Sequence, residues 1–165
     1  MKHVRLYEEE SVEISHYTTG EIRSKVWYED NKLHKEDGPA VIRYSRLGNI
    51  IKEIWYQYGE IHRDTYPASI SYFENGKIDT EEWCQNGKLH RLDGPAKIEY
   101  FSHGVLEEEW WQNGKLHRLD GPAVIWYNHG GTIDVKEWYW EGSELPATNQ
   151  EEFDALVELK KLGLI

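Results

Sequence analysis

Histidine and aspartate recur along the chain in the pattern His-x-x-Asp. The pairs are His34 with Asp37, His90 with Asp93, and His117 with Asp120. Imidazole and carboxylate groups at this spacing can bind a metal ion or transfer a proton. Such a site needs groups that converge on one point. Equivalent pairs of successive repeats would instead be separated by two strands, which is about 9.6 Å. We therefore expect turn bracing, with Asp accepting backbone N–H groups and His donating to a carbonyl or carboxylate. Metal binding is the alternative, and we expect no metal and no cofactor.

The single cysteine, Cys84, is the other candidate for chemistry. It occupies a strand position that other repeats fill with Tyr or Trp, so we interpret it as a packing residue rather than a nucleophile. One cysteine also excludes an intrachain disulfide. The sequence contains no phosphate-binding loop, no serine elbow and no zinc-ligand spacing. We therefore expect that the protein is not an enzyme.

Tryptophan marks an internal repeat. Trp27, Trp55, Trp83, Trp110 and Trp138 are spaced 28, 28, 27 and 28 residues apart. The same step relates His34, His62, His90 and His117, with Leu145 in the fifth position, and it relates the five Pro-Ala pairs. Coincident series at one period indicate a repeat architecture. We call these five the framework tryptophans and number units one to five by them.

Each unit contains the signals of two strands. The pattern Ala-x-Ile-x-Tyr, as in Ala96, Ile98 and Tyr100, alternates with period two and predicts a half-buried strand. A glycine turn follows, and then a second strand carries the framework Trp and ends at a tight turn such as Asn86-Gly87. The sequence thus predicts a mainly β fold: an elongated twisted antiparallel meander of about five two-stranded repeats with a C-terminal capping helix.

The ends of the array predict caps, because a terminal repeat has no neighbour to cover its apolar side. We expect a single repeat domain over 1–165, with an N-terminal cap at 1–13, five repeats of about 28 residues at 14–147, and a C-terminal cap at 148–165. Thr148 to Glu151 is interpreted as a capping box, which predicts a helix over about 149–162 that stops at Gly163. An N-terminal strand pair is expected from Val4, Leu6, Val12 and Ile14.

The repeat W-x-x-N-G-K-L-H-R-x-D-G-P-A resembles the degenerate MORN-like repeats of bacterial, phage and large-virus proteins. The resemblance covers about residues 14–147, although MORN repeats are usually shorter and have a core pattern of Tyr and Gly. It implies an elongated twisted antiparallel sheet that associates with proteins or membranes.

Charge narrows the choice of partner. The formal net charge is -11, with 30 acidic and 19 basic residues. This balance disfavours direct binding to nucleic acid or to an anionic membrane, so we expect a protein partner with a basic surface. The start of the chain lacks the apolar stretch of a signal peptide, and no apolar run is long enough to span a bilayer. A soluble, cytoplasmic protein is therefore expected.

Side chains between the framework residues vary from unit to unit, and this second face is where a partner would bind. We expect Trp111, Trp126 and Trp140 to point outward and to form, with Tyr139, a contact surface flanked by Glu82, Glu109 and Glu137. The alternative is that the C-terminal helix folds over these aromatic residues.

Three functions remain open at this stage. The leading hypothesis is a non-catalytic protein-binding scaffold that uses the outward aromatic and acidic face of repeats three to five. The second is a phage-type acidic inhibitor of a nucleic-acid-binding defence enzyme, and the third is a carbohydrate or small-ligand binder with stacked Trp. An exposed terminal strand also allows edge-to-edge homodimers.

Overall fold

The computed structural model describes residues 10–101 and 104–165, and it is a mainly β structure with one C-terminal helix, α1 (Gln150–Lys161). In this part of the chain one antiparallel sheet has 12 strands. Along the sheet lie β1 (Glu10–His16), β2 (Ile22–Glu29), β4 (Val41–Tyr44), β5 (Ile50–Ile54), β8 (Ser69–Tyr72), β9 (Ile78–Glu82), β12 (Lys97–Phe101), β13 (Gly104–Glu109), β16 (Val124–Tyr127), β17 (Ile133–Trp140) and β18 (Ser143–Leu145). The two-residue strands are β3 (Lys32–Leu33), β6 (Tyr56–Gln57), β7 (Glu60–Ile61), β10 (Cys84–Gln85), β11 (Lys88–Leu89), β14 (Trp111–Gln112) and β15 (Lys115–Leu116).

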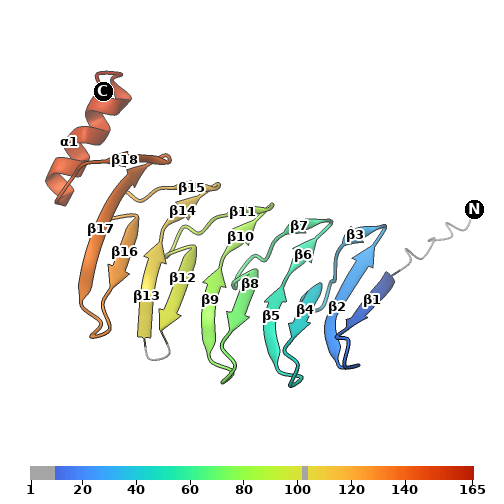
Figure 1. The fold of residues 1–165 in the computed structure, drawn as a ribbon. Helices are drawn as coiled ribbons and strands as arrows, with labels where there is room; N and C mark the ends of the chain where they lie inside the picture. The colour runs from blue at the N-terminus through green and yellow to red at the C-terminus, as the bar shows by residue number, and fades with distance from the viewer. Residues whose placement is uncertain (1–9, 102–103) are drawn as a thin grey trace, which may run out of the picture.

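The sheet follows the order of the chain, so the predicted antiparallel meander and the C-terminal helix are confirmed. Figure 1 shows the long strands side by side along a line from β1 to β17, with the short hairpins at one end of the strands. Val12 and Ile14 lie in β1 as expected, whereas Val4 and Leu6 lie outside the described residues. No helix of the described residues combines the length and the apolar character needed to cross a bilayer.

Tight turns close the short hairpins. Asn86 and Gly87 have φ of 50° and 73°, and Asn113 and Gly114 have φ of 52° and 78°. Two successive positive φ values define the type I′ turn, whose twist matches that of paired strands and which Asn-Gly adopts at low cost. The turn expected from the sequence at these two positions is therefore confirmed.

A β-bulge recurs in each long hairpin. The pairing register shifts between Ser15 and His16 and at four equivalent positions further along the chain. Each shift leaves one residue of the second strand without a partner: Arg23, Ile51, Asp79, Leu106 and Asp134. These residues keep the step of the framework tryptophans. Because a bulge reverses the alternation of the strand beyond it, period-two reasoning assigns faces correctly only on the tryptophan side of the bulge.

The first four framework tryptophans each connect two units through the backbone. The N–H of Trp55 donates to the carbonyl of Ala68 at 2.8 Å, and the carbonyl of Trp55 accepts the N–H of His62 at 3.1 Å. The same bonds recur in the neighbouring units. Ala68 is fully buried, as are the equivalent residues Ala40, Ala96 and Ala123. The repeated Ala is therefore the point at which successive units approach most closely.

A cationic side chain covers the ring of the framework Trp in the first four units. The distances from the cation to the ring centroid are 3.9 Å for Lys35 over Trp27, 3.9 Å for Arg63 over Trp55, 4.1 Å for Arg91 over Trp83 and 4.0 Å for Arg118 over Trp110. Attraction between a cation and the face of an indole ring stabilises such contacts by about 0.5–2 kcal/mol. The sequence showed this Lys or Arg after each His, but the contact itself was not expected.

The stacked arginines also fix the connection to the next unit. Arg91 donates to the carbonyl of Pro95 at 3.2 Å and through Nε to Asp93 at 2.9 Å. The same Arg–Pro bond holds unit two, where Arg63 donates to Pro67 at 3.1 Å. In that unit Thr65-Tyr66 stands where three other units have Asp-Gly, so a different turn is expected there. The Arg–Pro bond is nevertheless preserved.

The fifth unit has no cation over its tryptophan, because Pro146 follows Leu145. The ring of Phe153 from α1 lies there instead, with its centroid 5.2 Å from that of Trp138. Trp138, Leu145, Phe153 and Val157 form a buried cluster, and Phe153 is fully buried. The helix therefore covers the last tryptophan in place of the next arginine.

Both ends of α1 are closed by side chains or by glycine. Asn149 is the N-cap, since its side chain accepts the N–H of Glu152 at 3.0 Å, and Glu152 in turn accepts the N–H of Thr148 at 2.9 Å. The predicted box at Thr148 and Glu151 was therefore one residue too early. At the other end, Gly163 has φ of 68°. The N–H of Gly163 donates to the carbonyl of Lys160, and the N–H of Leu164 donates to the carbonyl of Leu159. This pair of bonds is a Schellman motif and confirms the predicted stop.

Replacing Phe153 by Ala should lower the free energy of unfolding by about 3–5 kcal/mol, because a fully buried aromatic ring is lost and a cavity remains. Urea denaturation followed by tryptophan fluorescence measures the loss. Leu159→Ala, at a position that is 37% exposed on the same helix, is the control and should cost much less. Similar losses in the two variants would show that α1 does not act as the cover of Trp138.

Candidate protein-binding surface

The two faces of the sheet carry different side chains. The framework face holds the recurring Trp, Ala, Ile and Tyr, and we call the opposite side the outer face. Backbone pairing places one row across the outer face: Arg43, Lys52, Ser71, Thr80, Glu99, Glu107, Trp126 and Val135. A second row runs beside it: Val41, Ile54, Ser69, Glu82, Lys97, Glu109, Val124 and Glu137.

Part of the core lies on the outer face. Val41, Ile54, Ser69 and Val124 are all buried, with between 3% and 8% of their surface exposed. The expectation that one face holds the core and the other is free was therefore too simple. A single sheet has no second layer to cover it, so neighbouring side chains must cover one another on both faces.

Lysine and glutamate form a compact cluster across the two rows. The ammonium group of Lys97 lies 2.8 Å from a carboxylate oxygen of Glu109 and 2.8 Å from one of Glu99. The second oxygen of Glu109 accepts the indole N–H of Trp111 at 2.6 Å. Glu82 is on β9, where Lys97 is its backbone partner. One cation thus stands among three carboxylates, and the cluster keeps a negative charge.

Glu107, in the first row, adds to the negative charge of the Lys97 cluster. It lies directly across from Glu99 on the neighbouring strand, an arrangement in which like charges repel. Burial raises the pKa of Glu107 above its ordinary value, and repulsion from Glu109 raises it further, whereas Lys97 opposes the shift. The fold therefore holds an ionised carboxylate here at a cost.

Trp126 is the most exposed of the predicted contact residues, with 46% of its surface accessible. It lies in β16 between Glu107 on β13 and Val135 on β17, and Val135 is 40% exposed. Exposed indole and isopropyl groups side by side, bordered by carboxylates, give a small apolar contact area with an acidic rim. The helix α1 leaves Trp126 accessible, although it was considered as a cover for this residue.

Trp111 and Tyr139 are half-buried and hydrogen-bonded. Trp111 donates to Glu109, as described above, and the hydroxyl of Tyr139 donates to Glu137 at 3.2 Å. Burial, followed by the charge of Glu137, raises the pKa of Tyr139. These aromatic residues therefore orient the carboxylates that were expected to flank them.

Trp140 does not join this surface. It is two residues after Trp138 on the same strand, and it packs against the buried cluster of Trp138, Leu145, Phe153 and Val157. The expectation that Trp140 points outward was therefore wrong, because the alternation of β17 gives it the same side as the framework Trp. For this residue the alternative of contact with the C-terminal helix cluster is the correct one.

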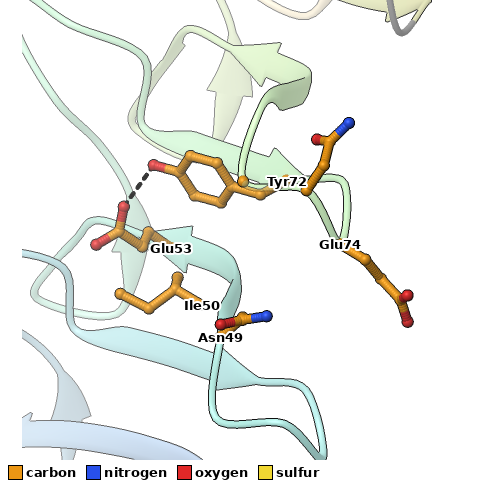
Figure 2. Close-up of a pocket in the computed structure, with 7 residues that line it drawn as sticks. Asn49, Ile50, Glu53, Tyr72 and Glu74 are labelled. Carbon is orange, nitrogen blue, oxygen red and sulfur yellow. Dashed lines mark hydrogen bonds between the residues drawn. The ribbon is translucent and has the colours of Figure 1, made fainter.

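Hydrogen-bonded carboxylates characterise the framework face. An open groove of about 590 Å³ lies between two units, and in it the hydroxyl of Tyr72 donates to Glu53 at 2.6 Å. Figure 2 shows this bond among the residues that line the groove. Asn49, Ile50 and Glu74 also line it. Equivalent bonds join Tyr100 to Glu81 at 2.6 Å and Tyr127 to Glu108 at 2.9 Å, and burial, then the bond to Glu108, raises the pKa of Tyr127 to about 12. The repetition of the bond indicates a brace between units.

The recurring histidines brace the junctions between units. Two of them contact a carboxylate as expected, since His34 Nε2 lies 2.9 Å from Glu29 and His62 Nε2 lies 3.0 Å from Asp64, and all four accept a second hydrogen bond that was not expected. His90 Nδ1 accepts the backbone N–H of Asn113 in the next unit at 3.1 Å. His34, His62 and His117 accept in the same way from Tyr58, Asn86 and Glu141. Asp93 and Asp120 are bonded to Arg91 and Arg118, and these bonds lower the pKa of each carboxyl. Within the described ranges, no three His, Cys, Asp or Glu side chains gather to hold a metal.

Cys84 is buried and is a poor nucleophile. Burial, followed by the charge of Glu82, raises the pKa of its thiol to about 12. The thiol is therefore protonated at neutral pH, and the reactive thiolate form is scarce. This environment agrees with the packing role inferred from the sequence.

Several residues of the surface were missed by the sequence analysis. Lys97, Glu99, Glu107 and Val135 were not among the predicted contact residues, although the alternation of β12 and β13 would have placed the first three beside Glu109. Val135 lies between the bulge at Asp134 and Trp138, so alternation counted back from Trp138 would also have placed it on the outer face.

Neutralising Glu107 should stabilise the protein at pH 7. Because the pKa of Glu107 is raised in the folded state, its ionisation costs stability, and Glu107→Gln should raise the free energy of unfolding by about 0.2–1 kcal/mol. The gain should shrink as pH falls and vanish below about pH 4, where Glu107 is protonated in the folded and unfolded states. Urea denaturation across this range measures it. Glu108→Gln, which affects a Tyr-bonded carboxylate of the opposite face, is the control and should give no gain.

Comparison with protein-family models, with curated proteins and with solved structures finds no match to this chain.

Proposed function

We propose that the protein is a non-catalytic scaffold that binds a protein with a basic surface through the outer face of units three to five. The observation that carries this proposal is the exposed Trp126 beside Val135 and Glu107. Tryptophan at the centre of a contact area contributes strongly to binding, because a large rigid ring leaves water on association. The acidic rim supplies the electrostatic preference for a basic partner.

The rigid position of the aromatic residues supports this function. Trp126 lies on a strand that is paired on both sides, and Trp111 and Tyr139 are held by their bonds to Glu109 and Glu137. Side chains that are already ordered lose little conformational freedom on binding, so more of the contact energy appears as affinity. Glu82 extends the acidic rim toward unit two along the second row.

The non-catalytic part of the proposal is supported by the engagement of the candidate chemical groups. The four histidines accept backbone N–H groups, and the thiol of Cys84 is buried. The histidines repeat along the array, as a structural role requires, whereas catalysis requires different groups at one point.

Trp126→Ala should weaken binding of the natural partner by about 2 kcal/mol or more, with little change in the free energy of unfolding. Affinity capture from the source cell with wild-type and variant bait identifies proteins lost in the variant, and calorimetry with the purified partner gives the dissociation constant. Tyr58→Ala is the matched control, since Tyr58 is 64% exposed but lies at a turn of unit two.

The captured species distinguishes the proposal from its alternatives. A basic nucleic-acid-binding enzyme that is inhibited on binding would establish the acidic-inhibitor role. Binding to a glycan array that depends on Trp126, without a protein partner, would favour the carbohydrate binder. Unchanged capture by Trp126→Ala together with loss in Tyr58→Ala would contradict the surface proposed here.

A further inference from the structure

Two pairs of like charges lie on the outer face, each on neighbouring strands. Arg43 on β4 is directly across from Lys52 on β5, and Glu99 on β12 is directly across from Glu107 on β13. The side chains of Arg43 and Lys52 make no ion pair or hydrogen bond with the described residues. Like charges at directly opposed positions destabilise a sheet. Both pairs therefore cost stability in the isolated chain, and they have opposite signs.

These pairs lie at equal distances from the middle of the sheet. In the first row the order is Arg43, Lys52, Ser71, Thr80, Glu99 and Glu107, so two positive, two neutral and two negative side chains follow one another. The centre of this pattern falls between β8 and β9. Five long strands precede that point, from β1 to β8, and five follow it, from β9 to β17. The centre of charge inversion is thus also the centre of the array.

We propose that the outer face binds a second copy of this chain in a symmetric, antiparallel dimer. A two-fold axis parallel to the strands and between β8 and β9 brings Arg43 over Glu107 of the second copy and Lys52 over Glu99 of the second copy. Symmetry repeats both contacts, which gives four ion pairs in one interface. A self-complementary patch is what a two-fold dimer requires.

The remainder of the row fits the same arrangement. The axis places Trp126 over Ser24 of the second copy, because β16 and β2 are equally far from the centre. The small side chain of Ser24 leaves room for an indole ring, and Trp126 loses the contact with water that it has in the single chain. Arg23, the bulge residue next to Ser24, makes no ion pair with the described residues and adds a cation beside that ring.

The net charge of -11 per chain opposes any self-association, but only at long range. At an ionic strength of about 0.15 M, charges farther apart than about 8 Å are largely screened, whereas charges in contact are not. The local pattern of the row therefore decides the outcome at physiological salt. At low salt the net repulsion is stronger and opposes the dimer.

This interface goes beyond the proposed function and competes with it. Dimerisation covers Trp126 and Glu107, which the basic partner would also use, so a bound partner and a second copy exclude each other. Arg43 and Lys52 have no part in the proposed partner site. Substitutions at these two residues therefore test the dimer without altering the partner surface.

Sedimentation velocity at about 0.15 M salt tests the dimer with two single charge reversals. Wild type should dimerise reversibly, and Arg43→Glu or Glu107→Lys alone should raise the dissociation constant at least about ten-fold, since each places like charges in contact twice. Both substitutions remove a like-charge pair within the chain, so neither should harm folding. An equimolar mixture of the two variants should form heterodimers, and a chain with both substitutions should dimerise again. Lys88→Glu, at an exposed hairpin position, is the control and should leave the dimer unchanged.

A wild-type chain that is monomeric at several hundred micromolar overturns the proposal. So does a dimer that is unaffected by either reversal, because it must use another surface such as the edge of β1. Failure of the mixed variants to associate also overturns the proposed contacts. The failure of the dimer would leave the partner site intact, since wild type and Arg43→Glu would then bind the partner equally. If the dimer exists, Arg43→Glu should bind the partner more tightly at high protein concentration than wild type does.

Discussion

The cation over the framework tryptophan is the interaction on which the arrangement of units depends. Arg91 covers the ring of Trp83 and also donates to the carbonyl of Pro95, so one side chain joins a unit's strand to the connection that leads into the next unit. The backbone of the same Trp bonds to Ala96 at the far end of that connection. This geometry brings successive strands together at a fully buried methyl group. Where the arginine is missing, after Trp138, Phe153 of the helix lies against the ring instead, so all five framework rings have a neighbour on this side.

The carboxylates of the two faces differ in their surroundings. On the framework face, carboxylates such as Glu53, Glu81 and Glu108 accept tyrosine hydroxyls from the next unit, so their charge serves the junction. On the outer face of units three and four, carboxylates repel one another, and Glu99 and Glu109 share the cation Lys97. Groups that a fold holds at a cost are the ones from which association can gain. The outer face is therefore the side on which a partner or a second copy is expected.

The sequence predicted the meander, the tight turns and the position of the helix, because each depends on local patterns of Trp, Asn-Gly and apolar residues. It also predicted that Trp126 is accessible. The expected outward side of Trp140 was wrong, because Trp140 lies two residues after Trp138 in β17 and alternation gives both residues the same side. The stacking of Arg on Trp and the bond from a backbone N–H to His90 were also missed. The Arg–Trp contact joins residues across a folded turn, and the bond to His90 comes from the next unit. The spacing of residues along the chain does not show which groups meet in these ways.

The bulges explain why a repeated frame can carry a varied charge pattern. Each hairpin has one extra residue on its second strand, at the same place, so every unit starts again with the same register whatever its outer side chains are. Substitution on the outer face then changes charge without shifting the pairing, and charge can be set strand by strand at intervals of about 4.8 Å. A row that changes sign at its centre is complementary to its own copy, whereas the acidic half alone is complementary to a basic protein. The same carboxylates serve the dimer and the basic partner. By mass action, a higher concentration of the chain therefore leaves a smaller fraction of the outer face free for the partner.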